Sequence, residues 1–223
     1  MKKLILFFLV TICLNAYAQN PYGLAIVNDN TDYKASIKAN PNNELVEIKK
    51  AVPTVVLDIR YATKNNFMKQ VMYKKAKAFA RKPVVQQLKV IQAELAKKGY
   101  GLKIFDAYRP YAITIAFYEK ASDKNFVANP AKGSKHNRGC AVDLTIIDLK
   151  TGKDVQMPTP YDSFAPEAAA QFNNLPAEII KNRDFLIATM QAHGFKVIYN
   201  EWWHFDFIGW QDYDLMDIPF QNL

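Results

Sequence analysis

The chain has 223 residues, with 29 basic and 21 acidic side chains and a formal net charge of +8. This length is enough for one well-buried domain and does not require a second one. The basic residues are scattered and form no stripe with interleaved aromatic residues, which argues against a nucleic-acid-binding protein.

The first predicted element is a secretory signal peptide at residues 1–18. Lys2 and Lys3 precede an apolar run at 4–14, and Ala-Tyr-Ala at 16–18 fits the small-x-small rule for cleavage. The run is too short for a membrane anchor, because a spanning helix takes about 20 apolar residues. We therefore expect an exported protein that starts at Gln19, resides in the periplasm or at the cell surface, and has no stable membrane span.

The chain after the signal peptide divides into a loose leader and a patterned region. Residues 19–43 are rich in Asn, Asp and Pro and show little periodicity, which predicts a loose N-terminal leader. Extended segments are predicted at 54–63, 102–108, 140–147, 195–200 and 203–208, and helices at 82–98, 110–121 and 177–193. Strands and helices do not alternate regularly, so we predict an α+β fold, a single domain with a small, mostly antiparallel sheet flanked by helices.

The stretch GSKHNRGCAVDLTI, residues 133–146, places a histidine on a loop and a carboxylate on the strand that follows. Asp143 lies among apolar residues of this strand, where a carboxylate is costly to bury unless it is paired or bound to a metal. His136, on the preceding loop, is a candidate partner. Cys140, at the start of the strand, is expected to be a small buried core residue rather than a nucleophile.

A second phrase, NEWWHFDF from Asn200, holds a glutamate three residues before a histidine. In a regular strand Glu201 would point away from His204, so a bulge near Trp202 is needed to bring both side chains to one cavity. Asp206 is expected to lie behind His204 or on the surface rather than to bind a metal.

Two histidines, one carboxylate and an open fourth position form the ligand set of a catalytic zinc site. Glu201 would then act as a general base toward the attacking water. A His-x6-Asp spacing is by itself a weak signal, and His204 between aromatic residues could be a packed core histidine. His193, just before a glycine that ends a helix, is expected to be a C-terminal cap that suits the helix dipole.

The full phrases resemble the zinc D-alanyl-D-alanine peptidases of the hedgehog-like fold, whose pattern is S-x-H-x-x-G-x-A-x-D followed by E-x-x-H. Every fixed position of that pattern is filled, by Ser134, His136, Gly139, Ala141, Asp143, Glu201 and His204. The resemblance implies that His136, Asp143 and His204 bind one zinc ion and that Glu201 is the general base. It runs from about residue 45 to residue 207, and we assign residues 44–223 to one zinc D,D-dipeptidase domain.

Three further phrases resemble the dipeptidase, VanX-like branch of this family: DIRYATKNNF, DAYRP and MPTPYDSF. By this resemblance Arg109 stabilises the transition state, Asp162 pairs with the substrate ammonium, and Tyr61 lines the same region. Ser134 fits the substrate carboxylate. The alternative for Arg109 is a surface salt bridge at the start of a helix, which would contribute little to stability.

Two positions depart from the pattern of this branch. Met68-Lys69 stands where a glycine is usual, and Pro158 replaces the glycine of the MGTxFD-like segment. Both changes reshape loops of the substrate pocket, so they leave the exact dipeptide open.

The resemblance implies a zinc metallopeptidase that splits D-Ala-D-Ala, or a close relative of it, in peptidoglycan turnover. The alternatives are a zinc D,D-carboxypeptidase or endopeptidase acting on wall stem peptides, and a non-catalytic wall-binding module that keeps zinc for structure. Asp162 argues against the first alternative, and Glu201 with Arg109 argues against the second.

Overall fold

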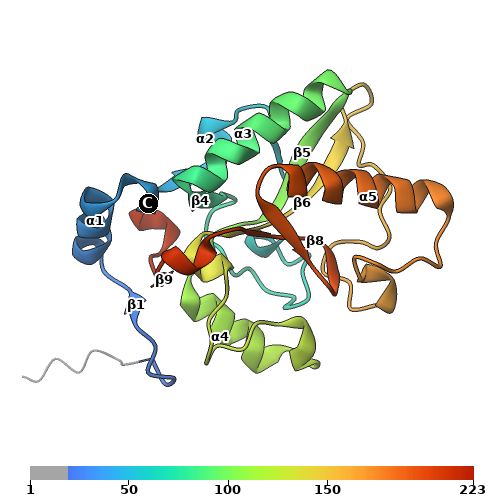
Figure 1. Ribbon diagram of the computed structural model, residues 1–223. Coiled ribbons are helices and arrows are strands. Elements are labelled where there is room, and N and C mark those ends of the chain that lie inside the picture. The colour runs from blue at the N-terminus through green and yellow to red at the C-terminus, as the bar shows by residue number, and fades with distance from the viewer. Residues whose placement is uncertain (1–19) are drawn as a thin grey trace, which may run out of the picture.

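A five-stranded sheet organises the computed structural model, which describes residues 20–223 (Figure 1). The predicted signal peptide, residues 1–18, lies outside the described residues. In spatial order the strands are β3 (Val56–Leu57), β5 (Tyr100–Asp106), β6 (Ala141–Asp148), β8 (Glu201–Phe207) and β7 (Phe195–Ile198). Only the β3–β5 pair of this sheet is parallel. The predicted α+β fold with a mostly antiparallel sheet is therefore confirmed.

Three longer helices flank this sheet. They are α3 (Lys82–Lys97), α4 (Tyr111–Lys120) and α5 (Ala177–Ala192). In the view of Figure 1, α3 lies at the top beside β5, and α4 lies at the bottom, below the sheet. α3 contacts β5, and α5 contacts β7 and β8. The inner residues of β6, Val142, Leu144 and Ile146, belong to the core on the other side from Asp143.

The sequence of α3 shows why a helix forms there. Its apolar stripe, Val84, Leu88, Ile91 and Leu95, is fully buried. A proline occupies its first turn, where a missing N–H costs nothing. The helix ends before Gly99, whose φ of +84° favours glycine. The predicted helices at 110–121 and 177–193 also form, each within one residue of its expected ends.

For the described part, residues 20–43, the prediction of a loose leader at 19–43 is wrong. β1 (Ile26–Val27) pairs in parallel with β9 (Leu215–Met216) near the other end of the chain, and α1 (Asn30–Ala39) follows it. Figure 1 shows this blue segment beside the red C-terminal residues. Two of the polar residues that suggested a leader, Asp29 and Asn40, cap helical turns. The Asp29 side chain accepts hydrogen bonds from the first turn of α1, and Tyr33 of that helix is buried.

The predicted strand at 54–63 is also shorter than expected. Only Val56–Leu57 pairs as a strand, and a 3₁₀ turn at Arg60–Ala62 follows. This turn buries Tyr61 in the core, where its ring packs against Phe117 at 4.6 Å between centroids. Aromatic packing therefore overrides the β-propensity of this segment.

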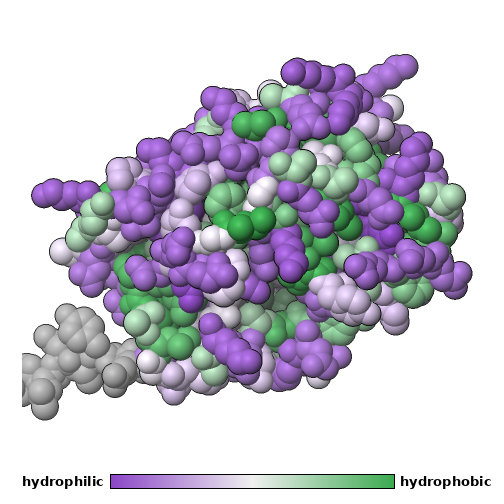
Figure 2. Space-filling model, in the orientation of Figure 1, coloured by the Kyte–Doolittle hydropathy of each residue, from purple (hydrophilic) through white to green (hydrophobic). Residues whose placement is uncertain are grey.

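Two short pairings complete the fold. β2 (Leu45–Glu47) runs antiparallel to β4 (Phe79–Arg81), and the short helix α2 (Ile48–Ala51) follows β2. Among residues 20–223, no helix has the length and apolar character needed to cross a bilayer. Hydrophilic side chains cover most of the face seen in Figure 2, with hydrophobic ones in separate groups.

Candidate active site

Two neighbouring strands bring the two sequence phrases together. In the antiparallel β6–β8 pair, Asp143 lies directly opposite His204, so both side chains project from the same face. The β7–β8 register shifts after Val197, so that Ile198 pairs with Glu201. The bulge predicted near Trp202 is therefore present, and it turns Glu201 toward the face that carries His204.

The loop before β6 supplies the second histidine. His136 opens a 3₁₀ turn that ends at Gly139, which has a φ of +68°. A Cβ atom at Gly139 would lie 2.6 Å from a Leu45 methyl carbon, so glycine is required there. The Asn137 side chain ties this turn to the Arg109 carbonyl and to the Thr114 hydroxyl. The histidine is thus held on a rigid turn.

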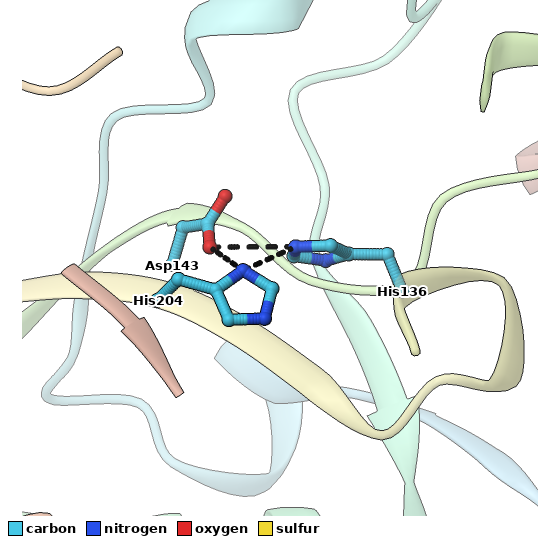
Figure 3. Close-up of side chains that lie close together, drawn as sticks. All are labelled: His136, Asp143 and His204. Carbon is cyan, nitrogen blue, oxygen red and sulfur yellow. Dashed lines mark hydrogen bonds and ion pairs between the residues drawn. The ribbon is translucent and has the colours of Figure 1, made fainter. Parts of the chain in front are cut away.

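The three predicted ligands converge, as Figure 3 shows. Asp143 Oδ1 lies 3.3 Å from His136 Nε2 and 3.0 Å from His204 Nδ1, and the two nitrogens are 3.2 Å apart. Bonds of about 2.0–2.1 Å to a tetrahedral zinc would separate its ligands by about 3.3–3.4 Å. Asp143 Oδ1 is buried and has no hydrogen-bond partner among the described residues. The three residues therefore fit a zinc ion.

Each of the two histidine rings is held by a hydrogen bond on the side away from the centre. His136 Nδ1 donates to the Ala107 carbonyl at 2.6 Å, and His204 Nε2 donates to Asp206 Oδ1 at 2.9 Å. Because a carbonyl and a carboxylate can only accept, these bonds leave a lone pair on the inward nitrogen of each neutral ring. Asp206 thus lies behind His204 and faces away from the centre.

The charges at the centre favour a bound cation. Burial would raise the pKa of Asp143, but the imidazoles of His136 and His204 outweigh it and hold that pKa well below its ordinary value. Burial opposes the charge of His204, but Asp143 and Asp206 raise its pKa to about 10. A divalent ion would take the place of the proton on His204 Nδ1.

Glu201 lies beside the centre without occupying a ligand position. Its Oε2 is 3.8 Å from His204 Nδ1, and its side chain is only 16% exposed. Burial and the negative charge of Asp143 raise the pKa of Glu201 to about 7, although the positive charges of His204 and Arg109 oppose this rise. Such a carboxylate can accept a proton at neutral pH and release it again.

Arg109 is buried, so the alternative of a surface salt bridge for this residue is wrong. Its Nε and Nη2 donate to Asp106 Oδ2 at 3.0 and 2.7 Å, while Tyr73 donates to the other oxygen at 2.8 Å. The guanidinium also lies 4.6 Å from the centre of the Phe117 ring. Burial opposes its charge, but Asp106 raises the pKa of Arg109 well above its ordinary value. Arg109 is therefore a fixed, permanent cation.

Asp162 contrasts with this paired arginine. Its Oδ1 accepts a hydrogen bond from Tyr61 at 3.0 Å, but its Oδ2 is buried without a partner among the described residues. Burial and the charge of Asp143 raise the pKa of Asp162 well above its ordinary value. Its φ of +62° is an uncommon conformation for a residue other than glycine. Among the described residues, no cation forms an ion pair with this carboxyl group, although the charge of Arg109 opposes the rise of its pKa.

One cavity of about 430 Å³ collects every residue that the sequence singled out for the site. Its volume is typical of small-molecule sites. The lining includes Tyr61, Arg109, Ser134, His136, Asp143, Asp162, Glu201 and His204. Ser134 is buried, and its hydroxyl oxygen accepts the His136 N–H at 3.2 Å, which leaves its own hydrogen free to donate. The structure therefore brings all eight residues together, and their roles stay predictions.

Sequence reasoning missed two side chains that hold the site. Asp106 belongs to the quoted phrase DAYRP, so its three-residue spacing from Arg109 was a signal that could have found it. Tyr161, on a loop 18 positions further along the chain, donates to Asp143 Oδ2 at 2.9 Å, and no local sequence pattern predicts this contact. Outside the site, Cys140 is buried as expected, and His193 caps α5 while bonding Glu94 at 2.8 Å.

Known proteins share sequence with this chain over most of its length. Residues 41–222 match the family described as D-Ala-D-Ala dipeptidase. A D-alanyl-D-alanine dipeptidase of Escherichia coli is 30% identical over 163 residues, covering 73% of this chain and 84% of the relative. One of Enterococcus faecalis is 28% identical over 188 residues, covering 74% and 88%. An LD-carboxypeptidase whose structure addresses peptidoglycan recognition shares 18% identity and a TM-score of 0.39, over 60% of this chain and 61% of that one.

Proposed function

Because the chain belongs to the D-Ala-D-Ala dipeptidase family of peptidases, we propose that it hydrolyses D-alanyl-D-alanine, or a closely related dipeptide, to free amino acids. One zinc ion would be held by His136, Asp143 and His204. The observation that carries the choice of a dipeptide is the buried, unpartnered carboxyl oxygen of Asp162 in the same cavity.

Asp162 fits the free ammonium group of a short substrate. A carboxyl group that is buried without a cation is costly, and an ammonium placed beside its Oδ2 would supply both a hydrogen bond and the missing charge. In a longer peptide that nitrogen is an amide, which is neutral and continues into a further residue. The site therefore favours a substrate whose amino end lies inside the cavity.

Glu201 is the proton carrier of the proposed reaction. It takes a proton from the water that attacks the peptide carbonyl and then passes that proton to the leaving amine. A pKa near 7 suits both steps, because the carboxyl can hold and lose the proton at neutral pH. Zinc, when bound, supplies polarisation of the carbonyl and activation of the water.

Arg109 stabilises the negative charge that develops on the carbonyl oxygen. Two of its nitrogens are used by Asp106, which fixes the plane of the guanidinium and leaves Nη1 for the substrate. The opposite end of the dipeptide, its carboxylate, meets the hydroxyl of Ser134, whose hydrogen is free. The cavity thus offers a partner to each charged group of a dipeptide.

The proposed setting is peptidoglycan turnover outside the cytoplasm. The support for export is the predicted signal peptide at residues 1–18, which the sequence carries ahead of the matched family region. Salvage of free wall dipeptides suits an exported enzyme. Removal of a precursor dipeptide suits it less, since that precursor is built in the cytoplasm.

The test follows amine release by the zinc-loaded chain from residue 19 onward. The substrates are D-Ala-D-Ala, N-acetyl-D-Ala-D-Ala and a wall pentapeptide that ends in D-Ala-D-Ala, with Glu201→Ala as the control. We expect turnover of the free dipeptide alone, and its loss in the control. The N-acetyl substrate keeps every group except the ammonium, so its resistance would isolate the role of Asp162.

The two alternatives predict other outcomes. Cleavage of the pentapeptide at a comparable rate would make the protein a carboxypeptidase. Zinc binding without turnover of any of these substrates, and without a difference between wild type and Glu201→Ala, would favour the non-catalytic wall-binding module.

A further inference from the structure

The hydroxyl of Tyr161 reaches the proposed metal ligand from outside the sheet. It donates to Asp143 Oδ2 at 2.9 Å, and both side chains are buried. The other oxygen, Oδ1, is the one that lies 3.0 Å from His204 Nδ1 and has no hydrogen-bond partner among the described residues. The hydroxyl therefore occupies one carboxylate oxygen and leaves the other free at the centre.

The ring of Tyr161 is fixed independently of this hydrogen bond. It stacks on Phe105 with centroids 4.5 Å apart and an interplanar angle of 16°, and it meets Trp203 edge-on at 5.6 Å. Two rigid contacts therefore aim the hydroxyl at Asp143. Packing of the ring does not require the hydroxyl, so the two contributions can be separated by removing the oxygen alone. The change Tyr161→Phe removes only the hydroxyl oxygen, and the ring keeps its contacts with Phe105 and Trp203.

We propose that Tyr161 is a positioning residue for the metal centre, which holds Asp143 as a one-oxygen ligand through Oδ1. The proposal rests on the proposed metal site. A carboxylate with both oxygens free can turn and bind a cation through either or both of them. One fixed hydrogen bond to Oδ2 removes that choice and keeps the ligand number low, as a catalytic zinc site requires.

The loop that carries Tyr161 also carries Asp162. Consecutive residues therefore contact the metal ligand and provide the carboxyl group that we assign to the substrate ammonium. The Tyr161 hydroxyl donates to Asp143, whereas Asp162 receives its hydrogen bond from Tyr61. Loss of each hydroxyl should therefore have a separate effect on metal binding and on substrate binding.

The experiment compares wild type, Tyr161→Phe and the matched variant Tyr61→Phe, which loses a hydroxyl from the same aromatic group. Zinc affinity is measured by competition with a chelating dye, and the visible absorption of Co²⁺-loaded protein reports the ligand number. We expect Tyr161→Phe to bind zinc about 10-fold more weakly or worse, with a weaker Co²⁺ band. Tyr61→Phe should keep zinc affinity within about twofold and raise KM for the dipeptide.

The melting temperature of each protein without metal checks that it is folded. If Tyr161→Phe binds zinc like wild type and gives the same Co²⁺ spectrum, the positioning role is wrong while the metal site stands. An equal loss of zinc affinity in both variants would also overturn it, because the effect would then belong to the aromatic cluster. Failure of wild type to bind zinc would overturn the metal site and the role of Tyr161 together.

Discussion

Replacement of Asp162 by asparagine should make the protein more stable and less active. The side chain keeps its shape and still accepts the Tyr61 hydrogen bond, and asparagine tolerates the φ of +62°. It loses the charge that has no cation in the free enzyme. An unsatisfied buried polar group costs about 1–3 kcal/mol, and more when it is charged. We therefore expect unfolding free energy to rise by about 1 kcal/mol or more at pH 8, roughly 2–4 °C in Tm.

The gain in unfolding free energy of Asp162→Asn over wild type should depend on pH in a defined direction. The pKa of Asp162 in the folded protein lies well above its ordinary value, because burial and the Asp143 charge oppose ionisation. An acid whose folded pKa is raised costs no stability below its unfolded pKa of about 3.9, and the penalty grows as pH rises through the folded value. The difference between Asp162→Asn and wild type should thus be small near pH 4 and grow toward pH 8.

Urea unfolding of the zinc-loaded proteins between pH 4 and 8 measures this difference, with dipeptide turnover measured in parallel. Turnover should fall because a buried ion pair that loses one partner costs about 3–5 kcal/mol, or at least 10²-fold in kcat/KM. Asp154→Asn is the control, since Asp154 is exposed and pairs with Lys103 at 2.9 Å. It should change stability by less than about 0.5 kcal/mol. Equal stability of Asp162→Asn and wild type at every pH would refute the reasoning.

Three further outcomes test the rest of the site. Glu201→Gln should lower kcat by about 10²–10⁴ while a chelator competition gives the zinc affinity of wild type, since the residue carries a proton and is not a ligand. Arg109→Lys should lower kcat by about 10²-fold with a smaller change in KM, because one ammonium cannot both pair with Asp106 and face the substrate; steady-state kinetics would show this split. Removal of zinc by a chelator should lower the Tm by roughly 5–10 °C in calorimetry, because an ion at 100 times its Kd adds about 2.7 kcal/mol.

The metal-binding phrases could be predicted because their positions carry direct structural meaning. Alternation along residues 140–147 places Asp143 on one face of a strand, and the same rule shows that Glu201 needs a bulge to join His204. Both features are present. The helix at 82–98 could be predicted equally well, because its apolar stripe and the flanking Pro83 and Gly99 all indicate a helix with these ends.

Other parts depend on contacts between segments far apart in the sequence. The hydrogen bond from Tyr161 spans 18 positions to Asp143, and the pairing of β1 with β9 joins opposite ends of the described chain. Residues 20–43 lack periodicity because their order comes from the cap at Asp29 and from one buried ring, Tyr33. Neither feature needs a repeating apolar pattern, so a rule based on periodicity could not detect the structure there.

Two carboxyl groups in one cavity show how environment assigns function to the same residue type. At Asp143 two imidazoles outweigh burial and lower the pKa. At Asp162 burial and the Asp143 charge raise the pKa, although the Tyr61 hydrogen bond and Arg109 oppose this rise. A protein gains no stability from an uncompensated buried acid, so the arrangement is explained by a ligand that brings the missing positive charge. A dipeptide brings that charge at its amino end, next to the bond that is cut. Under the proposed function, the cost of Asp162 in the free enzyme is therefore the physical basis of a preference for a free dipeptide.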